Sequence, residues 1–344
     1  MNSTIRDVAE KAGVSVATVS RTFAKPDLVM PDTRNRVLAA ADELNFVISR
    51  SATALKSRHT MRVAMLSSDT SDWFDAHIYK GLNQVFQSTG YDLAVYAINN
   101  VDQRQAFFKE LPLRRNTDAI VVSSFNVAAQ EFDDLQSINV PILGINVPHN
   151  NKFDATLSVN DRDDMQLIVN HLHALGHVRI AYAGTDLEEA PLEYSADYRR
   201  KWFEIACKTY PDIIPSIISV PRESAVADET ISRLIMMREQ PTAICCLSDA
   251  TAIPLLFKLP KTGLSVPSDI SLVGFDDSPY SEELGLTTIH QDPYSMGLRA
   301  ARITLELIAR NKTGETKTAT QPKGIFETAP SFLAIRNTTA APRS

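Results

Sequence analysis

The sequence predicts an all-α N-terminal domain followed by an α/β core of two Rossmann-like subdomains. Residues 1–46 show helical spacing of apolar side chains and no strand signal, whereas the chain from residue 62 onward alternates short apolar runs with amphipathic helices. These runs are too many for one compact sheet. With 344 residues and 44% hydrophobic composition, the chain is long enough for two or three globular domains and is neither disordered nor fibrous.

Three short helices are expected in the N-terminal domain. Residues 4–7 (TIRD) form a capping-box pattern at the start of the first helix, and Gly13 ends that helix in a tight turn. Ser15 caps a second helix in which Val19 points inward, and a third helix begins near Pro31. The pattern predicts a domain over residues 1–46 in which a glycine turn joins the first two helices.

The outward face of the second helix suits the major groove of DNA. If Val19 points inward, helical geometry places Ala17 and Arg21 on the opposite side, with Val16 and Ser20 on the flank. Small residues allow close approach to base edges, and an arginine makes a bidentate contact with guanine. The alternative is an ordinary three-helix domain in which Arg21 is only solvated.

The core sequence predicts strands that alternate with helices. The expected strands are Val63–Leu66, Leu93–Ile98, Ala119–Val122, Ile142–Ile145, Arg179–Ala183, Ala243–Leu247, Ser271–Phe275 and a last one at Phe332–Arg336. The expected helices are Ile78–Ser88, Met165–Leu175, Tyr198–Tyr210, Ala250–Leu259 and Met296–Ala309. A Thr- and Lys-rich segment over 311–323 is expected to be a loop. The alternation indicates parallel sheets that are covered on both faces.

A polar, basic linker over 47–61 separates the two parts, and charge is divided between them. The whole chain carries a net charge of −6, but residues 1–60 carry +3 and the remainder −9. Such a division is typical of a basic module attached to an acidic body, and equally of an ordinary solvated surface. The total charge alone therefore does not exclude binding to nucleic acid.

Several other function classes lack support in the sequence. Cys207, Cys245 and Cys246 form neither a disulfide framework nor a zinc spacing, which favours a reducing, cytoplasmic location. No signal peptide or apolar stretch of roughly 18 residues is present, so no membrane is expected. His171 and His173 point to different sides of a helix, so no metal site is expected. Without phosphate-loop or hydrolase motifs, neither an enzyme nor a cofactor is expected.

The N-terminal string closely resembles a known DNA-binding domain. TIRDVAEKAGVSVATVSRTFA at 4–24, continued by PDTRNRVLAAADELNF at 31–46, is similar to the headpiece of the lac repressor (LacI/GalR) family of bacterial transcription regulators. The resemblance implies a helix-turn-helix domain in which Val16, Ala17 and Arg21 read bases. It also implies that three hydroxyl side chains hold the DNA backbone: Ser15, Thr18 and Ser20.

The resemblance gives the linker a role. In the family, the segment that matches 49–57 folds into a hinge helix on operator DNA, and a leucine at the position of Leu55 wedges into the minor groove. Ala52 lies on the same short apolar edge, and Ile48 stands where many relatives have proline. The alternative is that Leu55 is a lone apolar residue of a linker.

Further strings extend the resemblance over almost the whole chain: LGHVRIAYAG at 175–184, SLVGFDDSP at 271–279 and LTTIHQDPYSMG at 286–297. They are similar to the periplasmic-binding-protein type I-like core of the same family. The resemblance implies an N-terminal subdomain of about 62–160 and 293–323 and a C-terminal subdomain of about 161–290 and 324–340. The two subdomains close on a small ligand at the carboxyl ends of the strands.

Candidate ligand-binding residues follow the ends of the predicted strands. Asp69, Trp73 and Phe74 lie in the loop after the first core strand, although the two aromatic residues are alternatively core residues. Asp249 follows a later strand and is equally a helix N-cap. The other candidates at strand ends or an expected crossover are Phe275, Asp276 and Gln291.

Two further candidates come from the resemblance. Asp161 matches a polar family residue that touches the effector, and Tyr194 stands where many relatives carry an effector-binding arginine. Without that arginine an anionic effector loses one partner, which favours a neutral sugar.

The sequence thus predicts a sequence-specific DNA-binding transcription regulator, a repressor of carbohydrate-utilisation genes. It is expected to act as a homodimer on a near-palindromic operator and to respond allosterically to a small sugar-like effector between the core subdomains. The alternative is a soluble sugar-binding or sugar-processing protein whose N-terminal helices are structural.

Overall fold

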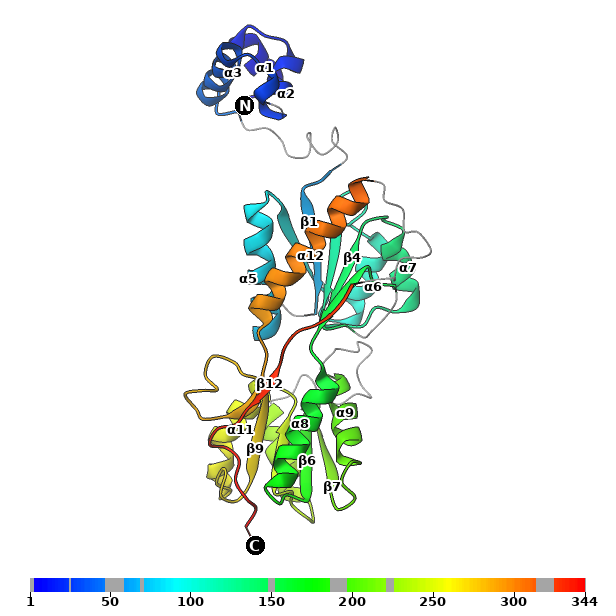
Figure 1. The fold of residues 1–344 in the computed structure, drawn as a ribbon, viewed down its shortest axis with the longest axis vertical. Helices are drawn as coiled ribbons and strands as arrows, with labels where there is room; N and C mark the ends of the chain where they lie inside the picture. Colours follow the sequence, from blue (N-terminus) through cyan, green and yellow to red (C-terminus); the bar gives the residue numbers. More distant parts are fainter. Residues whose placement is uncertain are drawn as a thin grey trace. The chain divides into compact units, whose positions relative to one another are not determined.

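The computed structural model describes residues 3–24, 26–46, 59–68, 71–147, 152–185, 197–220, 226–313 and 325–343. The chain forms two compact units, the headpiece Met1–Thr60 and the core Met61–Ser344 (Figure 1). In the described ranges, no helix is long and apolar enough to cross a membrane.

The headpiece is all-α over its described residues. It consists of α1 (Ile5–Ala12), α2 (Val16–Ala24) and α3 (Pro31–Glu43), with a 3₁₀ turn at Pro26–Leu28 between α2 and α3. One valine from each α-helix is completely buried at the centre: Val8, Val19 and Val37. The inward position of Val19 confirms the helical phase that the sequence predicted for α2.

The capping residues of α1 and α2 explain where these helices begin and end. Thr4 and Asp7 form a capping box, in which the Asp7 carboxylate accepts from the Thr4 N–H at 2.7 Å. Gly13 has φ +65° and ends α1, because glycine adopts this left-handed conformation without steric cost. Ser15 Oγ accepts from the Thr18 N–H at 3.1 Å at the start of α2.

The core contains two six-stranded sheets, which define an N-terminal and a C-terminal subdomain. The first sheet has the order β11-β5-β4-β3-β1-β2, all parallel: β1 (Arg62–Ser67), β2 (Asp92–Ala97), β3 (Ala119–Ser123), β4 (Ile142–Ile145), β5 (Ala155–Ser158) and β11 (Ile325–Thr328). The second has the order β12-β10-β9-β8-β6-β7: β6 (Arg179–Thr185), β7 (Ile214–Val220), β8 (Ala243–Cys246), β9 (Ser271–Asp276), β10 (Thr287–His290) and β12 (Phe332–Ala334). Only β12 pairs antiparallel among these strands.

Helices cover both faces of each sheet, and each face has its own buried apolar cluster. The N-terminal subdomain has α5 (Trp73–Ser88), α6 (Val101–Glu110), α7 (Ala129–Gln136) and α12 (Pro293–Thr313). The C-terminal subdomain has α8 (Asp161–Ala174), α9 (Asp197–Cys207), α10 (Val226–Met236) and α11 (Asp249–Lys258). This arrangement confirms the predicted pair of doubly covered α/β subdomains.

Two glycines allow α5 and α12 to pack at very short range beside each other (Figure 1). A Cβ atom on Gly81 would lie 2.3 Å from the Tyr294 carbonyl oxygen, and one on Gly297 would lie 2.4 Å from the Ile78 carbonyl oxygen. No side chain fits at either position. α12 follows directly after the crossover from β10. Its contact with α5 therefore anchors that crossover to the N-terminal subdomain.

In the described residues, three segments connect the two subdomains. They are the segment from β5 to α8, the segment from β10 to α12 and the segment from β11 to β12. The last crossover corrects the sequence prediction, which placed 324–340 in the C-terminal subdomain. Residues 325–328 form β11 and pair parallel with β5 of the first sheet, so the chain crosses at 329–331. The strand escaped prediction because it is a four-residue edge strand that follows a Thr- and Lys-rich segment.

Candidate functional site

The outward face of α2 is the candidate DNA-reading surface. Val16 is 41% exposed, and Ala17 and Arg21 are exposed as well, which agrees with the helical geometry inferred from the sequence. Buried Val19 and half-buried Phe23 hold the opposite face against the headpiece core, where the Phe23 and Phe46 ring centroids lie 6.2 Å apart. The role of the exposed residues in reading bases stays a prediction.

Hydroxyl groups gather at the N-terminus of α2. Ser15 and Thr18 form a hydrogen bond of 2.9 Å between their side-chain oxygens, and Ser20 is half-buried on the same helix. The first backbone N–H groups of a helix attract anions, so this end suits a phosphate. The predicted hinge residues Ala52 and Leu55 lie outside the described residues.

Arg199 of α9 lies at the centre of the polar cluster in the core. Its Nε donates to Asp161 Oδ1 at 3.1 Å, and Nη1 donates to the Leu247 carbonyl oxygen at 2.8 Å. The same Nη1 lies 3.8 Å from Asp276 Oδ1, and the guanidinium carbon lies 3.6 Å from the centroid of the Phe275 ring. We call Asp161, Arg199, Phe275, Asp276 and Gln291 the effector cluster.

Gln291 completes this cluster from the crossover between β10 and α12. Its Nε2 donates to Asp276 Oδ1 at 2.9 Å, while its buried Oε1 has no hydrogen-bond partner among the described residues. Asp276 has φ +133°, a strained backbone conformation for a residue with a side chain. The Asp276 carboxylate at the end of β9 lies beside both Arg199 and Gln291, and within the described ranges the Gln291 Oε1 atom is a free acceptor.

Burial dominates the electrostatics of the effector cluster. It raises the pKa of Asp161 and raises the pKa of Asp276 well above its ordinary value, because a charged carboxylate is costly away from water. Arg199 opposes both shifts. Burial also lowers the pKa of Arg199, but Asp161 and Asp276 outweigh this effect and raise it. Arg199 therefore stays charged, and both carboxyl groups interact with this one positive charge.

The start of α5 faces this cluster from the other subdomain. Asp72 caps α5 by accepting from the Phe74 N–H at 3.0 Å, and its charge further raises the pKa of Asp276. Phe74 is buried in the core of the N-terminal subdomain, whereas Trp73 is half-buried and its buried Nε1 has no partner among the described residues. Trp73 thus carries an unpartnered donor directly after Asp72 in the sequence.

Asp249 behaves differently from the other candidates. It is completely buried, and its carboxylate accepts from the Ser278 N–H at 2.8 Å, from Ser281 Oγ at 2.6 Å and from Thr288 Oγ1 at 2.7 Å. These bonds tie the start of α11 to the segment that follows β9. The carboxylate is fully engaged within its own subdomain. The remaining candidates, Asp69 and Tyr194, lie outside the described residues.

The sequence reasoning missed two charged groups. Arg199 stands beside Tyr198 in a helix whose periodicity gives no sign that the arginine is buried. Asp75 is 2% exposed and accepts from Ser123 Oγ at 2.6 Å, Ser67 Oγ at 2.9 Å and Ser124 Oγ at 3.0 Å. A carboxylate that follows a strand-to-helix loop is a signal that could have identified Asp75.

The buried Asp75 predicts a specific pH dependence of stability. Burial raises its pKa to about 6, above the ordinary value of 3.8, so the folded state binds this proton more tightly than the unfolded state. The group therefore contributes stability below pH 3.8 that is lost as the pH rises to about 6, a loss of about 3 kcal/mol. Urea denaturation of Asp75→Asn between pH 4 and 6 is expected to lack this loss. If the free energy of unfolding changes equally with pH in the variant and the wild type, this prediction is wrong.

The three histidines whose spacing suggests a metal site each have a different hydrogen-bond partner. His171 pairs with Thr339 at 2.9 Å, and His173 pairs with Asp212 at 3.1 Å. His177 pairs with Thr242 at 2.8 Å. Over the described ranges, no cluster of three or more metal-binding side chains occurs.

Two family models match the chain. Residues 4–49 match the model described as bacterial regulatory proteins, lacI family, and residues 169–327 match a periplasmic binding protein-like domain. The first covers the three helices of the headpiece, and the second runs from within α8 through most of the C-terminal subdomain to α12 and most of β11.

Relatives and solved structures cover nearly the full length. The HTH-type transcriptional repressor PurR of Vibrio parahaemolyticus is 30% identical over 342 residues, 98% of each chain. The lac repressor dimer bound to operator and the anti-inducer ONPF has a TM-score of 0.82 at 24% identity and covers 99% of this chain and all of that one. A LacI family regulator from Enterococcus faecalis with bound ribose has a TM-score of 0.68 at 20% identity, covering 82% of this chain and all of that one.

The headpiece match and the full-length relatives decide between the two functions that the sequence left open. A sugar-processing protein with purely structural N-terminal helices does not fit a chain that aligns from end to end with transcriptional repressors. The chain belongs to the lacI family of bacterial regulatory proteins: it is a DNA-binding, effector-regulated transcriptional repressor and not an enzyme.

Proposed function

We propose that the effector is a neutral sugar that binds at the effector cluster, between the two core subdomains. The observation that carries the proposal is the pairing of Arg199 with both Asp161 and Asp276. With its charge shared by two carboxylates, Arg199 leaves no surplus positive charge for an anionic ligand. A ligand with hydroxyl groups fits this balance better.

Unpartnered polar atoms support the same class of ligand. The Oε1 atom of Gln291 accepts a hydrogen bond, and the Nε1–H of Trp73 donates one, and neither has a partner in the described part of the chain. Buried polar groups normally have partners, so each unpaired one is a candidate contact. A sugar hydroxyl both donates and accepts, and therefore satisfies either atom. The Enterococcus faecalis structure with bound ribose is consistent with a sugar in this fold.

We further propose that the repressor acts in the cytoplasm as a homodimer on a near-palindromic operator and controls carbohydrate-utilisation genes. Val16, Ala17 and Arg21 read bases, and Ser15, Thr18 and Ser20 hold the backbone. Ala52 and Leu55 act at the minor groove. The operator-bound lac repressor is a dimer, which supports this arrangement. Effector binding between the subdomains changes their arrangement and thereby the affinity for DNA, a population shift.

Asp276→Asn is expected to abolish thermal stabilisation by the sugar while leaving DNA binding without sugar unchanged. Asparagine keeps the size and the branching of aspartate, but it loses the negative charge that accepts hydroxyl hydrogen bonds. The measurement is a thermal-shift screen of mono- and disaccharides, followed by titration of the sugar that stabilises the wild type.

The adjacent Asp277 supplies a matched control. It pairs with Arg336 at 2.7 Å and with His290 at 2.9 Å, so Asp277→Asn removes a neighbouring carboxylate outside the effector cluster. The control is expected to keep the thermal shift by the sugar. An unchanged shift in Asp276→Asn would place the sugar elsewhere.

A further inference from the structure

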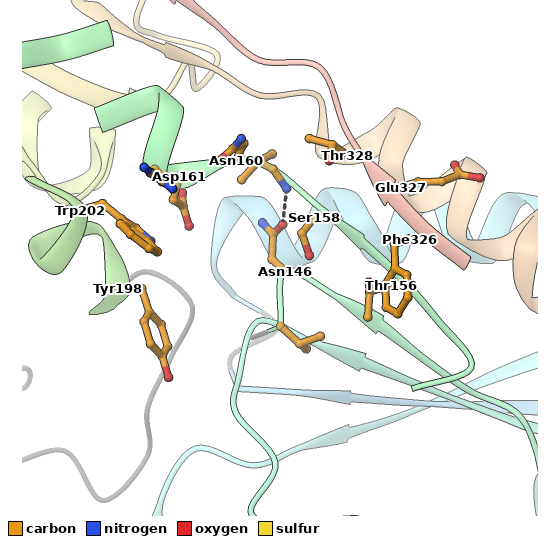
Figure 2. A pocket seen from close by; sticks show the side chains of 13 residues that line it. Asn146, Thr156, Ser158, Asn160, Asp161, Tyr198, Trp202, Phe326, Glu327 and Thr328 are labelled. Atoms are coloured by element: carbon orange, nitrogen blue, oxygen red, sulfur yellow. Dashed lines mark hydrogen bonds between the residues drawn. The ribbon is translucent and has the colours of Figure 1, made fainter. Parts of the chain in front are cut away.

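A cavity lies beside the effector cluster, next to the crossovers between β5 and α8 and between β11 and β12. We call it the hinge cavity. Its volume is about 350 Å³, within the range of small-molecule sites. One side is formed by the ends of β4, β5 and β11 of the N-terminal subdomain. The other side is formed by the start of α8 and by α9 of the C-terminal subdomain (Figure 2).

A buried carboxamide points into the hinge cavity. Asn146 is 94% buried, and its Oδ1 accepts from the Val159 N–H at 2.9 Å. This bond fixes the orientation of the amide, so the Nδ2 group faces the side on which Asp161 and Trp202 lie (Figure 2). No partner for Nδ2 occurs among the described residues. Because the amide oxygen is already hydrogen-bonded, the Nδ2 donor is held in a fixed position. There it is able to bond to an oxygen atom of a ligand.

Hydroxyl groups add to this polar wall. Ser158 and Thr328 line the hinge cavity from neighbouring strands, and in the described ranges neither hydroxyl has a hydrogen-bond partner. A hydroxyl donates one hydrogen bond and accepts two. Together with the Asn146 amide, these groups offer uncharged donors and acceptors on one side of the cavity.

Aromatic rings flank the hinge cavity. Tyr198 and Trp202 are four residues apart on α9 and therefore share a face of the helix, and Phe326 lies across the cavity on β11 (Figure 2). The guanidinium carbon of Arg162, which also lines the hinge cavity, lies 5.9 Å from the Trp202 ring centroid. Large rings beside a few fixed polar groups are typical of sites that bind a ring with one apolar face.

The two carboxylates of the hinge cavity are balanced by arginines outside it. Asp161 accepts from Arg199, and Glu327 accepts from Arg299 Nε at 2.8 Å. The described lining therefore presents no free carboxylate for a cation, and its remaining charge is the exposed Arg162, whose guanidinium lies over the Trp202 ring. An uncharged polar ring fits this balance.

We propose that the hinge cavity binds a sugar ring, in addition to the ring held at the effector cluster. The proposal rests on the proposed function for the class of ligand. The ring is either the second unit of a disaccharide or a separate monosaccharide. Asp161 links the two positions, because it lines the hinge cavity and also bonds to Arg199. Because both subdomains supply walls, a ring in the cavity stabilises one arrangement of the subdomains.

The sequence has two tryptophans: Trp202 lines the hinge cavity, and Trp73 follows Asp72, whose charge acts on Asp276 of the effector cluster. The full-length protein is labelled with 5-fluorotryptophan, and Trp73→Phe and Trp202→Phe assign the two ¹⁹F resonances. The labelled protein is titrated with ribose, glucose, galactose, cellobiose, lactose and maltose. We expect the Trp202 resonance to shift and saturate. A disaccharide that moves both resonances at one midpoint identifies a bridging ligand, and a monosaccharide with two midpoints identifies separate molecules.

Variants decide whether the Trp202 response arises in the hinge cavity. Asn146→Ala is expected to weaken the Trp202 titration at least tenfold and to leave the Trp73 titration by a monosaccharide unchanged. Phe326→Ala tests the opposite wall of the cavity. Because Phe326 is 43% exposed, this change leaves no buried void. Asn99→Ala, the same change at an exposed position of the same subdomain, is the control.

The outcomes separate the two proposals. If sugars move the Trp73 resonance but never the Trp202 resonance, the hinge cavity does not bind a ring, while the proposed function stands. A Trp202 titration that Asn146→Ala and Phe326→Ala leave unchanged also overturns the assignment of the hinge cavity. If no sugar moves either resonance or stabilises the protein, the proposed function fails as well.

Discussion

Arg199→Gln is expected to lower the free energy of unfolding by about 3–5 kcal/mol at pH 7 and to abolish the response to the sugar. The Arg199 side chain is 6% exposed, and its removal leaves Asp161 and Asp276 buried without their counter-charge. The loss of the cation also frees the Leu247 carbonyl oxygen and the face of Phe275. Urea denaturation measures the first effect and sugar titration the second.

The pH dependence of Arg199→Gln identifies the cause. Both carboxyl groups already have raised pKa values in the folded state, and removal of Arg199 raises them further. The folded variant therefore binds protons more tightly than the unfolded chain, so its stability is expected to recover as the pH falls from 7 toward 4. The control is Arg200→Gln, which loses a partly exposed pair with Glu204 and a hydrogen bond of 3.3 Å to Ser219 Oγ and is expected to cost roughly 0–1 kcal/mol. Equal losses in the two variants would contradict the assignment.

Arg21→Ala is expected to remove discrimination between the operator and operators changed at a single guanine. A bidentate arginine–guanine contact contributes about 1–3 kcal/mol of discrimination, or roughly 5- to 150-fold in affinity. Arg21 is exposed on the outward face of α2, so its loss leaves the headpiece core intact. Fluorescence anisotropy with labelled duplexes measures the affinities, and binding of the sugar to the core is expected to be unchanged.

Arg36→Ala serves as the control for Arg21→Ala. Arg36 is exposed on α3, and its removal deletes the same charge from the headpiece without touching the α2 face. Its effect is expected to be uniform across operators and to reduce the salt dependence of binding, as for a charge that acts on phosphates. If Arg21→Ala discriminates between operators as well as wild type does, Arg21 is not a base-reading residue.

The headpiece was predictable because its structure is set by local signals. The capping box, the glycine turn and the burial of Val19 all depend on residues within one or two helical turns, and each appears in the structure as expected. The exposed face of α2 then follows from helical geometry alone. The alternation of the core likewise predicted two α/β subdomains, because buried parallel strands are nearly continuous apolar runs.

The parts that escaped prediction depend on contacts distant in sequence. Arg199 is buried because Asp161 and Leu247, far apart in the chain, converge on it. Asp249 follows a strand as a ligand-binding carboxylate would, but the hydroxyls of Ser281 and Thr288 engage it. Neither convergence has a local signal. Short half-exposed elements such as β11 escaped for a related reason, since their apolar pattern is too brief to stand out.

The proposed mechanism links these parts through the crossovers. Gln291 lies on the crossover between β10 and α12, and Asp161 begins α8 directly after the crossover from β5. A sugar that contacts both residues contacts two of the segments about which the subdomains rearrange. This position gives the ligand different contact free energies in the two arrangements, which is the physical requirement for a population shift.

The affinity of the full-length protein for its operator, measured with and without the stabilising sugar in wild type and Asp276→Asn, tests the central claim most directly. DNA upstream of the protein's own gene is the first duplex to examine. The account predicts sequence-selective binding by both proteins and a change in affinity on adding sugar in wild type alone. An equal response in both proteins, or no sequence-selective binding at low salt, would contradict it.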